Sequence, residues 1–320
     1  MPKSYDIFNG DADGVCALHQ LRLAQPRNAD LVTGVKRDIR LLERVEAQAG
    51  DELTVLDISM KSNAAALQRI LGSGAHVQYF DHHAVAQIPE HASLEAHIDT
   101  SPDVCTSLLV DRHLRGAHRM WAVVAAFGDN LVNAAIGAAQ PLQLDHTELA
   151  RLHELGECLN YNAYGDSVDD LHYHPADLYR AMAPYKDPRH FIFDEPVFNV
   201  LRAAYGEDLY RASELTPLLN KDTAVVYVLP NAAWSRRING LFGNRLAQQN
   251  PGRAHAVLVE TGGGYRVSVR APVNEPQGAA ALCERFASGG GREAAAGIDR
   301  LASSELDRFT AAFLETFSRT

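Results

Sequence analysis

Acidic residues follow directly on three stretches of the chain that are predicted to be β-strands. The strands, with the polar residues that follow them, are Tyr5–Phe8 with Asn9, Asp11 and Asp13, Leu53–Leu56 with Asp57, and His76–Phe80 with Asp81, His82 and His83. The carboxyl ends of parallel strands meet at one edge of an open sheet, where ligands bind. We therefore expect these side chains to lie in one crevice, although they are far apart in sequence.

A group of carboxylates and imidazoles in one crevice is suited to divalent cations. Crowded carboxylates repel one another and have raised pKa values unless cations lie between them. Oxygen ligands with one or two imidazoles suit Mg²⁺ or Mn²⁺, and less selectively Co²⁺ or Zn²⁺. Two such ions about 3.5–4 Å apart provide a hydroxide near neutral pH and hold a phosphoryl group. The pattern therefore indicates hydrolysis of a phosphate ester.

Each part of this pattern also has a simpler explanation. Asp11 and Asp13 before a glycine are typical of a loop turn, and Asp57 could cap the helix that follows it. Adjacent histidines are common on protein surfaces. The occurrence of all three features at predicted strand ends favours the metal site.

The elements that position these residues alternate between strand and helix. Helices are predicted at about Val15–Leu23, Ile39–Ala47 and Ala64–Leu71, and a further strand at Leu31–Val35. This alternation predicts an α/β fold with a mostly parallel sheet. From about residue 104 to residue 185 the pattern is helical, and a break rich in proline and aromatic residues follows.

The last hundred residues predict a smaller α/β domain across a cleft from the first. Strands are expected at Ala224–Leu229, His255–Glu260 and Arg266–Arg270, and a Gly-rich loop precedes an amphipathic helix at Glu305–Phe317. We predict a metal-binding catalytic domain over residues 1–195, a linker over 196–221 and a substrate-binding domain over 222–320.

Five motifs resemble those of the DHH phosphoesterase family and occur in the order that the family has. They are Asp11 and Asp13 in NGDADG, Asp57 in VLDIS, Asp81-His82-His83, Asp129 in AAFGDN, and GGGREAAAG over residues 289–297. The last is similar to the GGGHxxAAG signature of the DHH-associated C-terminal domain. The resemblance spans nearly the whole chain. Within the family, the acidic charge balance and the lack of an extended basic stripe favour the short-substrate, nano-RNase or oligoribonuclease-like branch.

The resemblance implies a centre with two Mn²⁺ ions, for which Mg²⁺ or Co²⁺ could substitute. Asp57 would bridge the ions, Asp11 would complete one site, and Asp13, His82 and Asp129 the other. His83 and Asp81 would lie beside the ions as catalytic residues. The substrate would be bound by Arg292 with Gly289, Gly290 and Gly291.

Two positions depart from the family pattern. Asn9 stands where the family has a His or Asp ligand, so it is included among the metal ligands as a neutral one. Arg292 stands where the GGGH histidine is expected; it offers phosphate a bidentate fork but no proton.

Further polar residues have alternative interpretations. Thr106 and Ser107 are predicted to begin a helix, and a simple capping role is favoured over an anion site. Arg236, Arg237 and Arg245 could contact phosphates of an oligonucleotide or form a solvated helix face.

Composition and charge exclude some locations and partners. The chain has 320 residues, a net charge of −10 and four widely spaced cysteines, which fits a reducing compartment. Residues 1–220 carry 18 Lys and Arg against 31 Asp and Glu, whereas residues 221–320 carry 12 against 9. The start MPKSYDIF has no apolar signal core. A cytoplasmic location is expected, with no membrane partner and no long duplex DNA.

The predicted function is metal-dependent hydrolysis, through a metal-activated hydroxide, of a small phosphate ester, nucleotide or short oligonucleotide. Because Asn9 and Arg292 both depart from the family pattern, the alternative is a nucleotide-binding or regulatory module with weak catalysis. Hydrolysis of a chromogenic phosphodiester with and without Mn²⁺ separates the two. The sequence leaves open the substrate, the physiological metal and the oligomeric state, a homodimer included.

Overall fold

A computed structural model describes residues 2–318 and divides the chain into two compact units. The first runs to Ala203 and the second begins at Ala204. The division falls inside helix α9 (Pro196–Ser213), a continuous helix within the region that the sequence analysis assigned to a linker. The domain limits inferred from the sequence stay predictions.

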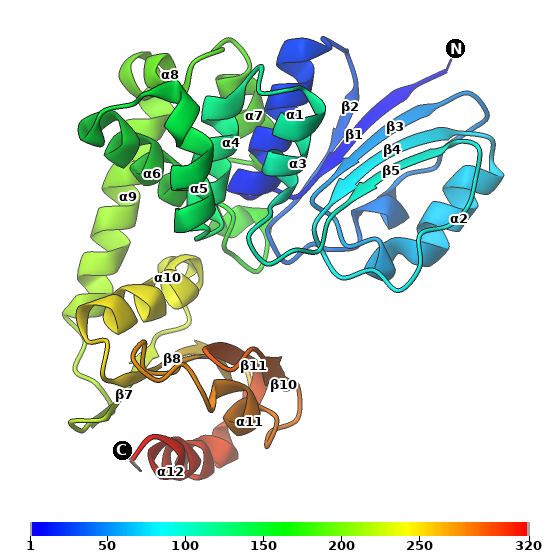
Figure 1. Cartoon of the computed structure of the whole chain (residues 1–320). Coiled ribbons are helices and arrows are strands. Elements are labelled where there is room, and N and C mark those ends of the chain that lie inside the picture. The colour runs from blue at the N-terminus through cyan, green and yellow to red at the C-terminus, as the bar shows by residue number, and fades with distance from the viewer. Residues whose placement is uncertain (1, 319–320) are drawn as a thin grey trace. The chain divides into compact units, whose positions relative to one another are not determined.

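The first unit is built on a five-stranded parallel sheet, as the sequence predicts. Its strands are β1 (Ser4–Phe8), β2 (Asp30–Val32), β3 (Glu52–Leu56), β4 (His76–Asp81) and β5 (Leu94–Ile98). They lie in the order β2-β1-β3-β4-β5, and every neighbouring pair is parallel (Figure 1). The chain leaves β1 toward one side of the sheet and returns on the other side, so the switch point lies between β1 and β3. Ligands of open α/β sheets bind at such a point.

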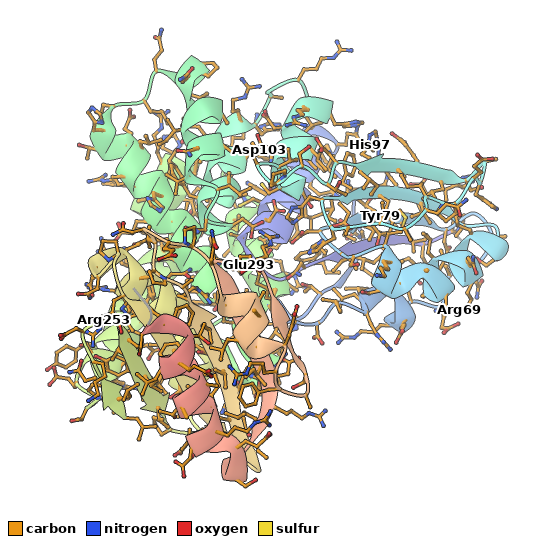
Figure 2. All side chains as sticks on the ribbon, turned by 60° about the horizontal axis from the view of Figure 1, so that its bottom comes forward. Arg69, Tyr79, His97, Asp103, Arg253 and Glu293 are labelled. Carbon is orange, nitrogen blue, oxygen red and sulfur yellow. The ribbon has the colours of Figure 1, made fainter. Side chains whose placement is uncertain are left out.

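One face of this sheet packs on helix α2 (Ala64–Gly72) and a short 3-10 helix, η1 (Leu41–Arg44). Alternate strand residues such as Ile7, Val55 and Tyr79 form the buried layer between them; Tyr79 is labelled in Figure 2. The other face carries α1 (Ala12–Ala24), which packs against α3 (Thr106–His113) and α4 (Arg119–Gly128).

The helix expected over Ile39–Ala47 is wrong, because only η1 forms there. The Asn63 amide donates to the Ile39 carbonyl at 2.6 Å, and Arg69 donates to the Val45 carbonyl at 3.0 Å. These side chains satisfy backbone groups that helical hydrogen bonds would otherwise satisfy. The apolar side chains Leu41 and Leu42 are buried all the same.

A group of helices completes the first unit. They are α5 (Val132–Ala139), α6 (His146–Tyr161), α7 (Pro175–Met182) and α8 (Pro188–Asp194), with 3-10 turns η2 (Lys61–Asn63), η3 (Gln140–Leu142) and η4 (Val168–Asp170). Helix α8 lies where the sequence predicts only a break. Its proline occupies the first helical position and Asp187 caps it, so residues typical of loops here begin a helix.

The second unit contains a mixed six-stranded sheet. Its strands are β6 (Leu219–Asn220), β7 (Ala224–Leu229), β8 (Ala254–Thr261), β9 (Gly264–Arg270), β10 (Gly289–Gly291) and β11 (Ala295–Ala302), in the order β10-β11-β9-β8-β7-β6. Only β7 and β8 are parallel, joined by α10 (Ala233–Gln249). A helix α11 (Ala279–Cys283), a turn η5 (Ser303–Glu305) and a helix α12 (Leu306–Phe317) complete it. Phe309 and Phe313 of α12 are buried in its core.

Within residues 2–318, no helix has both the length and the apolar character needed to cross a membrane.

Candidate metal centre

Carboxylates gather at the carboxyl ends of β1, β3 and β4. Asp57 follows β3 immediately and adopts a φ of 58°, a left-handed conformation that is uncommon for a non-glycine residue. It is 2% exposed and accepts a hydrogen bond from the Thr106 hydroxyl at 3.3 Å. It does not cap the next helix, because Asn63 occupies that position. The unusual backbone turns the Asp57 carboxylate toward the switch point.

Asp11 begins helix α1 from the loop after β1. Its Oδ1 accepts the backbone N–H groups of Asp13 and Gly14, both at 3.1 Å. This is an N-cap, which fixes the orientation of the carboxylate and leaves Oδ2 directed away from the helix.

Asp13 connects helix α1 to helix α3. Its two carboxylate oxygens accept the backbone N–H groups of Thr106, at 2.7 Å, and Ser107, at 2.6 Å. The expectation that Thr106 or Ser107 caps its own helix is therefore wrong, since the N-cap residue is Cys105 and it makes no side-chain capping bond. The anion at this helix N-terminus is the Asp13 side chain itself.

Asp129 enters the same region from the end of α4. It is the C-cap residue, and Asn130 after it has a φ of 61°, which completes the helix end. Its Oδ2 lies 3.9 Å from His82 Nε2, and the side chain is 12% exposed. The fourth predicted acid thus joins the other three although it lies on a different element.

The Asp81-His82-His83 segment places its three side chains differently. Asp81 is fully buried and accepts hydrogen bonds from the backbone N–H groups of Met60 and His82. Its Oδ1 also lies 2.6 Å from His83 Nδ1. The His83 side chain is 42% exposed, so Asp81 orients an imidazole that is partly open to solvent.

Two carboxyl groups of the cluster, those of Asp57 and Asp13, resist ionisation. Burial raises the pKa of Asp57 well above its usual range, and the neighbouring carboxylates Asp11 and Asp13 raise it further. Burial, with the charge of Asp129, also raises the pKa of Asp13 to about 6. A positive charge placed among these groups would be stabilised by all of them.

The donor set fits a divalent metal ion. His82 Nδ1 lies 2.8 Å from the Val104 carbonyl, which can only accept, so Nδ1 carries the proton and Nε2 the lone pair. That Nε2 lies 3.4 Å from Asp57 Oδ1. Two sets of potential ligand atoms lie within 4.8 Å of one another: Asp57, His82 and His83, and Asp13, His82 and Asp129.

Lys36 also lies in this cluster, although no sequence motif predicted it as a site residue. Its Nζ pairs with Asp11 Oδ2 at 2.6 Å and with Asp129 Oδ1 at 3.2 Å. Burial alone would raise the pKa of Asp11, but Lys36 lowers it below its ordinary value. Lys36 follows the short strand β2, which is the neighbour of β1. That position at the same sheet edge is the signal that could have identified it.

Asn9, predicted as a neutral metal ligand, has both ends of its amide in hydrogen bonds. Its Nδ2 donates to the Lys36 carbonyl at 3.2 Å, and its Oδ1 accepts the Asp11 N–H at 3.3 Å. The side chain therefore ties the segment that carries Lys36 to the turn that carries Asp11.

Comparison with solved structures identifies the architecture. Exonuclease RecJ bound to manganese superposes with a TM-score of 0.64 at 16% identity, covering 99% of this chain and 90% of that chain. A DHH domain from a member of the s1p family of ribosomal proteins gives 0.64 at 12% identity, over 98% and 86%. The chain has a DHH-type fold.

A third structure with the DHH-type fold is PggH, a pGpG-specific phosphodiesterase from Vibrio cholerae. Its TM-score is 0.58 at 15% identity, and 98% of each chain is covered. No family model matches the sequence, and no curated protein matches it. The likeness to these structures is one of fold. The candidate metal centre is therefore argued from the residues of this chain described above.

The predicted substrate-binding residues lie in the second unit, on the β10–β11 hairpin. Gly289–Gly291 form strand β10 rather than a loop, and Arg292 is exposed in the turn that follows. Gly291 has a φ of 146°, and a Cβ there would lie 2.5 Å from the Ala296 Cα. The pairing of β10 with β11 thus accounts for this glycine, and the substrate role of the segment stays a prediction.

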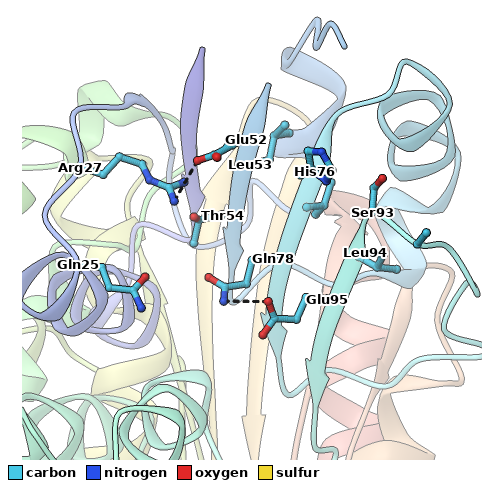
Figure 3. A pocket seen from close by; sticks show the side chains of 12 residues that line it. Gln25, Arg27, Glu52, Leu53, Thr54, His76, Gln78, Ser93, Leu94 and Glu95 are labelled. Carbon is cyan, nitrogen blue, oxygen red and sulfur yellow. Dashed lines mark hydrogen bonds and ion pairs between the residues drawn. The ribbon is translucent and has the colours of Figure 1, made fainter. Parts of the chain in front are cut away.

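A separate hollow of about 330 Å³ lies at the opposite end of the parallel strands (Figure 3). It is lined by polar side chains, among them Thr54, Gln78 and Glu95, which are register neighbours on β3, β4 and β5. None of the predicted site residues lines it. The hollow is therefore distinct from the candidate metal centre.

Proposed function

We propose that the protein is a metal-dependent phosphoesterase that hydrolyses a small phosphate ester, a nucleotide or a short oligonucleotide. The observation that carries the proposal is a cluster of four buried or nearly buried carboxylates at the switch point of a parallel sheet, three of which, Asp13, Asp57 and Asp129, lie around the His82 imidazole. The carboxylates are those of Asp11, Asp13, Asp57 and Asp129.

The ion would be held by Asp13, Asp57, His82 and Asp129, and Mn²⁺ is the first choice. When bound, a divalent ion lowers the pKa of a water molecule and neutralises charge on the phosphoryl oxygens. RecJ was solved with manganese, and PggH is a phosphodiesterase, which supports this chemistry for the fold. Another structure of similar fold is an exopolyphosphatase-related protein from Bacteroides fragilis, with a TM-score of 0.52.

His83 is the residue of this chain that would move a proton. Asp81 accepts from its Nδ1, which fixes the tautomer and leaves Nε2 of this partly exposed side chain as the nitrogen that would face the substrate. Burial by itself would lower the pKa of His83, but the Asp81 hydrogen bond and the nearby carboxylate charges together raise it. A protonated His83 can donate to the leaving oxygen as a general acid. Asp81 acts through His83 and is a positioning residue.

The test is hydrolysis of bis-p-nitrophenyl phosphate, with and without Mn²⁺, by the full chain and by Asp57→Asn. Asparagine tolerates a positive φ, so this substitution removes charge and keeps the backbone conformation. We expect Mn²⁺-dependent turnover in the parent protein and a loss of about 10²-fold or more in the variant. A panel of dinucleotides, pyrophosphate and polyphosphate then assigns the substrate class.

The alternative, a nucleotide-binding module with weak catalysis, predicts a different result. In that case Mn²⁺ would not stimulate hydrolysis of any member of the panel, while nucleotides would still bind in calorimetry. Metal-dependent turnover that Asp57→Asn abolishes would exclude it.

A further inference from the structure

Lys36 occupies a position among the carboxylates that would suit a metal ion. Its ammonium nitrogen lies 2.6 Å from Asp11 Oδ2, 3.2 Å from Asp129 Oδ1 and 3.3 Å from Asn160 Oδ1. An ammonium group has three N–H donors, and three oxygens lie within hydrogen-bonding distance of it. The Lys36 charge is thus held by acceptors from three different elements.

The backbone of Lys36 is fixed as firmly as its side chain. Its N–H donates to the Ala163 carbonyl at 2.9 Å, and its carbonyl accepts from Asn9 Nδ2 at 3.2 Å. The loop before it approaches the β1 loop so closely that a Cβ on Gly10 would lie 2.0 Å from the Gly34 carbonyl oxygen. A side chain larger than hydrogen at position 10 would therefore separate the two loops.

A divalent ion cannot share these oxygens with the ammonium group. Mn²⁺ and Mg²⁺ bind carboxylate oxygens at about 2.0–2.3 Å, close to where the Lys36 nitrogen lies from Asp11 Oδ2. A cation there would also lie beside a fixed positive charge at short range, where Coulomb repulsion is strong. The donors that Lys36 leaves available are on the other side of the cluster: Asp13, Asp57, His82 and the second oxygen of Asp129.

We propose that Lys36 takes the place of one of the two ions that the family resemblance implies, so that this centre binds a single divalent ion beside a built-in ammonium group. The inference rests on the proposed function and sharpens it. Lys36 supplies one fixed positive charge that is shared between the carboxylates of Asp11 and Asp129. Asn9 holds the Lys36 segment instead of ligating metal. Lys36 is in this sense a positioning residue, and the number of bound ions reports its role.

The experiment counts Mn²⁺ ions on the full chain after chelator treatment, by calorimetry and equilibrium dialysis, with electron paramagnetic resonance as a second readout. We expect about one ion per chain, with the spectrum of an isolated Mn²⁺. Lys36→Met keeps the aliphatic stem, removes the charge and exposes Asp11, so the count should rise to about two, with a spin-coupled spectrum. Lys36→Arg should keep the count at about one.

Arg37→Met is the matched control, because Arg37 is the next residue and pairs with Asp166 at 2.9 Å outside the cluster. Its count should equal that of the parent protein. Two ions on the parent protein would overturn the inference and leave the proposed function intact, and so would an unchanged count in a folded Lys36→Met. No Mn²⁺ on the parent protein would instead overturn the proposed function. The number of Mn²⁺ ions on the parent protein tests the inference even if Lys36→Met fails to fold.

Discussion

At the scale of single residues, the Asp81–His83 pair shows how a buried side chain orients its neighbour by a hydrogen bond. Asp81 has no exposed atom free for a ligand, whereas nearly half of the His83 side chain is open. The two were predicted together as catalytic residues, but the geometry supports different roles for them. The proposed general acid is His83.

We predict that His83→Gln slows hydrolysis in proportion to how poor the leaving group is. For a ribose or alkyl alkoxide, kcat should fall by about 10²–10⁴-fold, because that oxygen needs a proton as it departs. For p-nitrophenolate, which leaves without a proton, the fall should be small. Rates measured over a series of leaving groups test this, with the exposed His146→Gln as control. Equal losses on every leaving group would contradict the role.

Most of the residues that meet at the candidate metal centre were predictable, because they lie at the carboxyl ends of predicted strands. Asp11 and Asp57 follow strands with a clear apolar pattern and Asp81 ends another, so their convergence follows from parallel topology. Lys36 follows a strand of three residues that is only partly buried, and no motif surrounds it. Its contact with Asp129 depends on how α4 packs, which no local pattern encodes.

At the scale of elements, a buried ion pair joins β1 to α1. Arg22 donates to both carboxylate oxygens of Asp6, and its guanidinium also donates to the Thr54 hydroxyl on β3 at 2.9 Å. The side chains of the pair are 6% and 2% exposed. Losing one partner would therefore leave the other charge buried and uncompensated.

Arg22→Met should destabilise the fold by about 3–5 kcal/mol, measured by urea unfolding. The double variant with Asp6→Leu should recover most of that loss, because it leaves no charge behind. Arg27→Met is the matched control: Arg27 pairs with Glu52 at 3.2 Å on the surface and should cost about 1 kcal/mol or less. A double variant as unstable as Arg22→Met would contradict the explanation.

A buried histidine in β8 makes the second unit sensitive to acid. His255 is 1% exposed, and burial, with the charge of Arg253, lowers its pKa from the ordinary 6.5 to about 4. Since the folded pKa is below the unfolded one, the unfolded chain binds the extra proton between those values. Stability is therefore complete above about pH 6.5 and is lost as the pH falls toward 4.

His255→Leu should flatten that dependence by roughly 2–3 kcal/mol between pH 7 and pH 4. Urea unfolding at several pH values provides the measurement, with the exposed His91→Leu as control. An unchanged pH dependence would show that the folded protein accepts the proton at this site.

Element boundaries were predicted best where an apolar pattern and a terminating residue coincide. Strand β7 was predicted with the bounds that the structure has, and α12 within one residue. The Gly-rich tail was read as a loop because glycine weakens a strand on its own. It forms β10 because it pairs with β11, and at Gly291 that strand approaches too closely for a side chain. This depends on the pairing and not on the local sequence.

At the scale of the whole molecule, the family resemblance predicts that the second unit binds the substrate through Arg292. Arg292→Ala in the second unit should raise KM by about ten- to a hundredfold with kcat nearly unchanged, since a charge-assisted contact is worth roughly 1.5–3 kcal/mol. Arg300→Ala, another exposed arginine of that unit, is the control. Steady-state kinetics on a dinucleotide test this prediction. Unaltered KM and kcat would mean that the Gly-rich segment is a structural hairpin without a role in substrate binding.

The bonds from Asp13 to the start of α3 also constrain the order in which the molecule assembles. They join residues 93 and 94 positions apart, so the first turn of α3 finds its acceptor only after a long loop has closed. Contacts of such separation slow the folding of a chain. Until Asp13 and Thr106 meet, the Asp13 carboxylate lacks the two N–H donors that orient it, so a chain still emerging or half-folded presents no complete centre for hydrolysis.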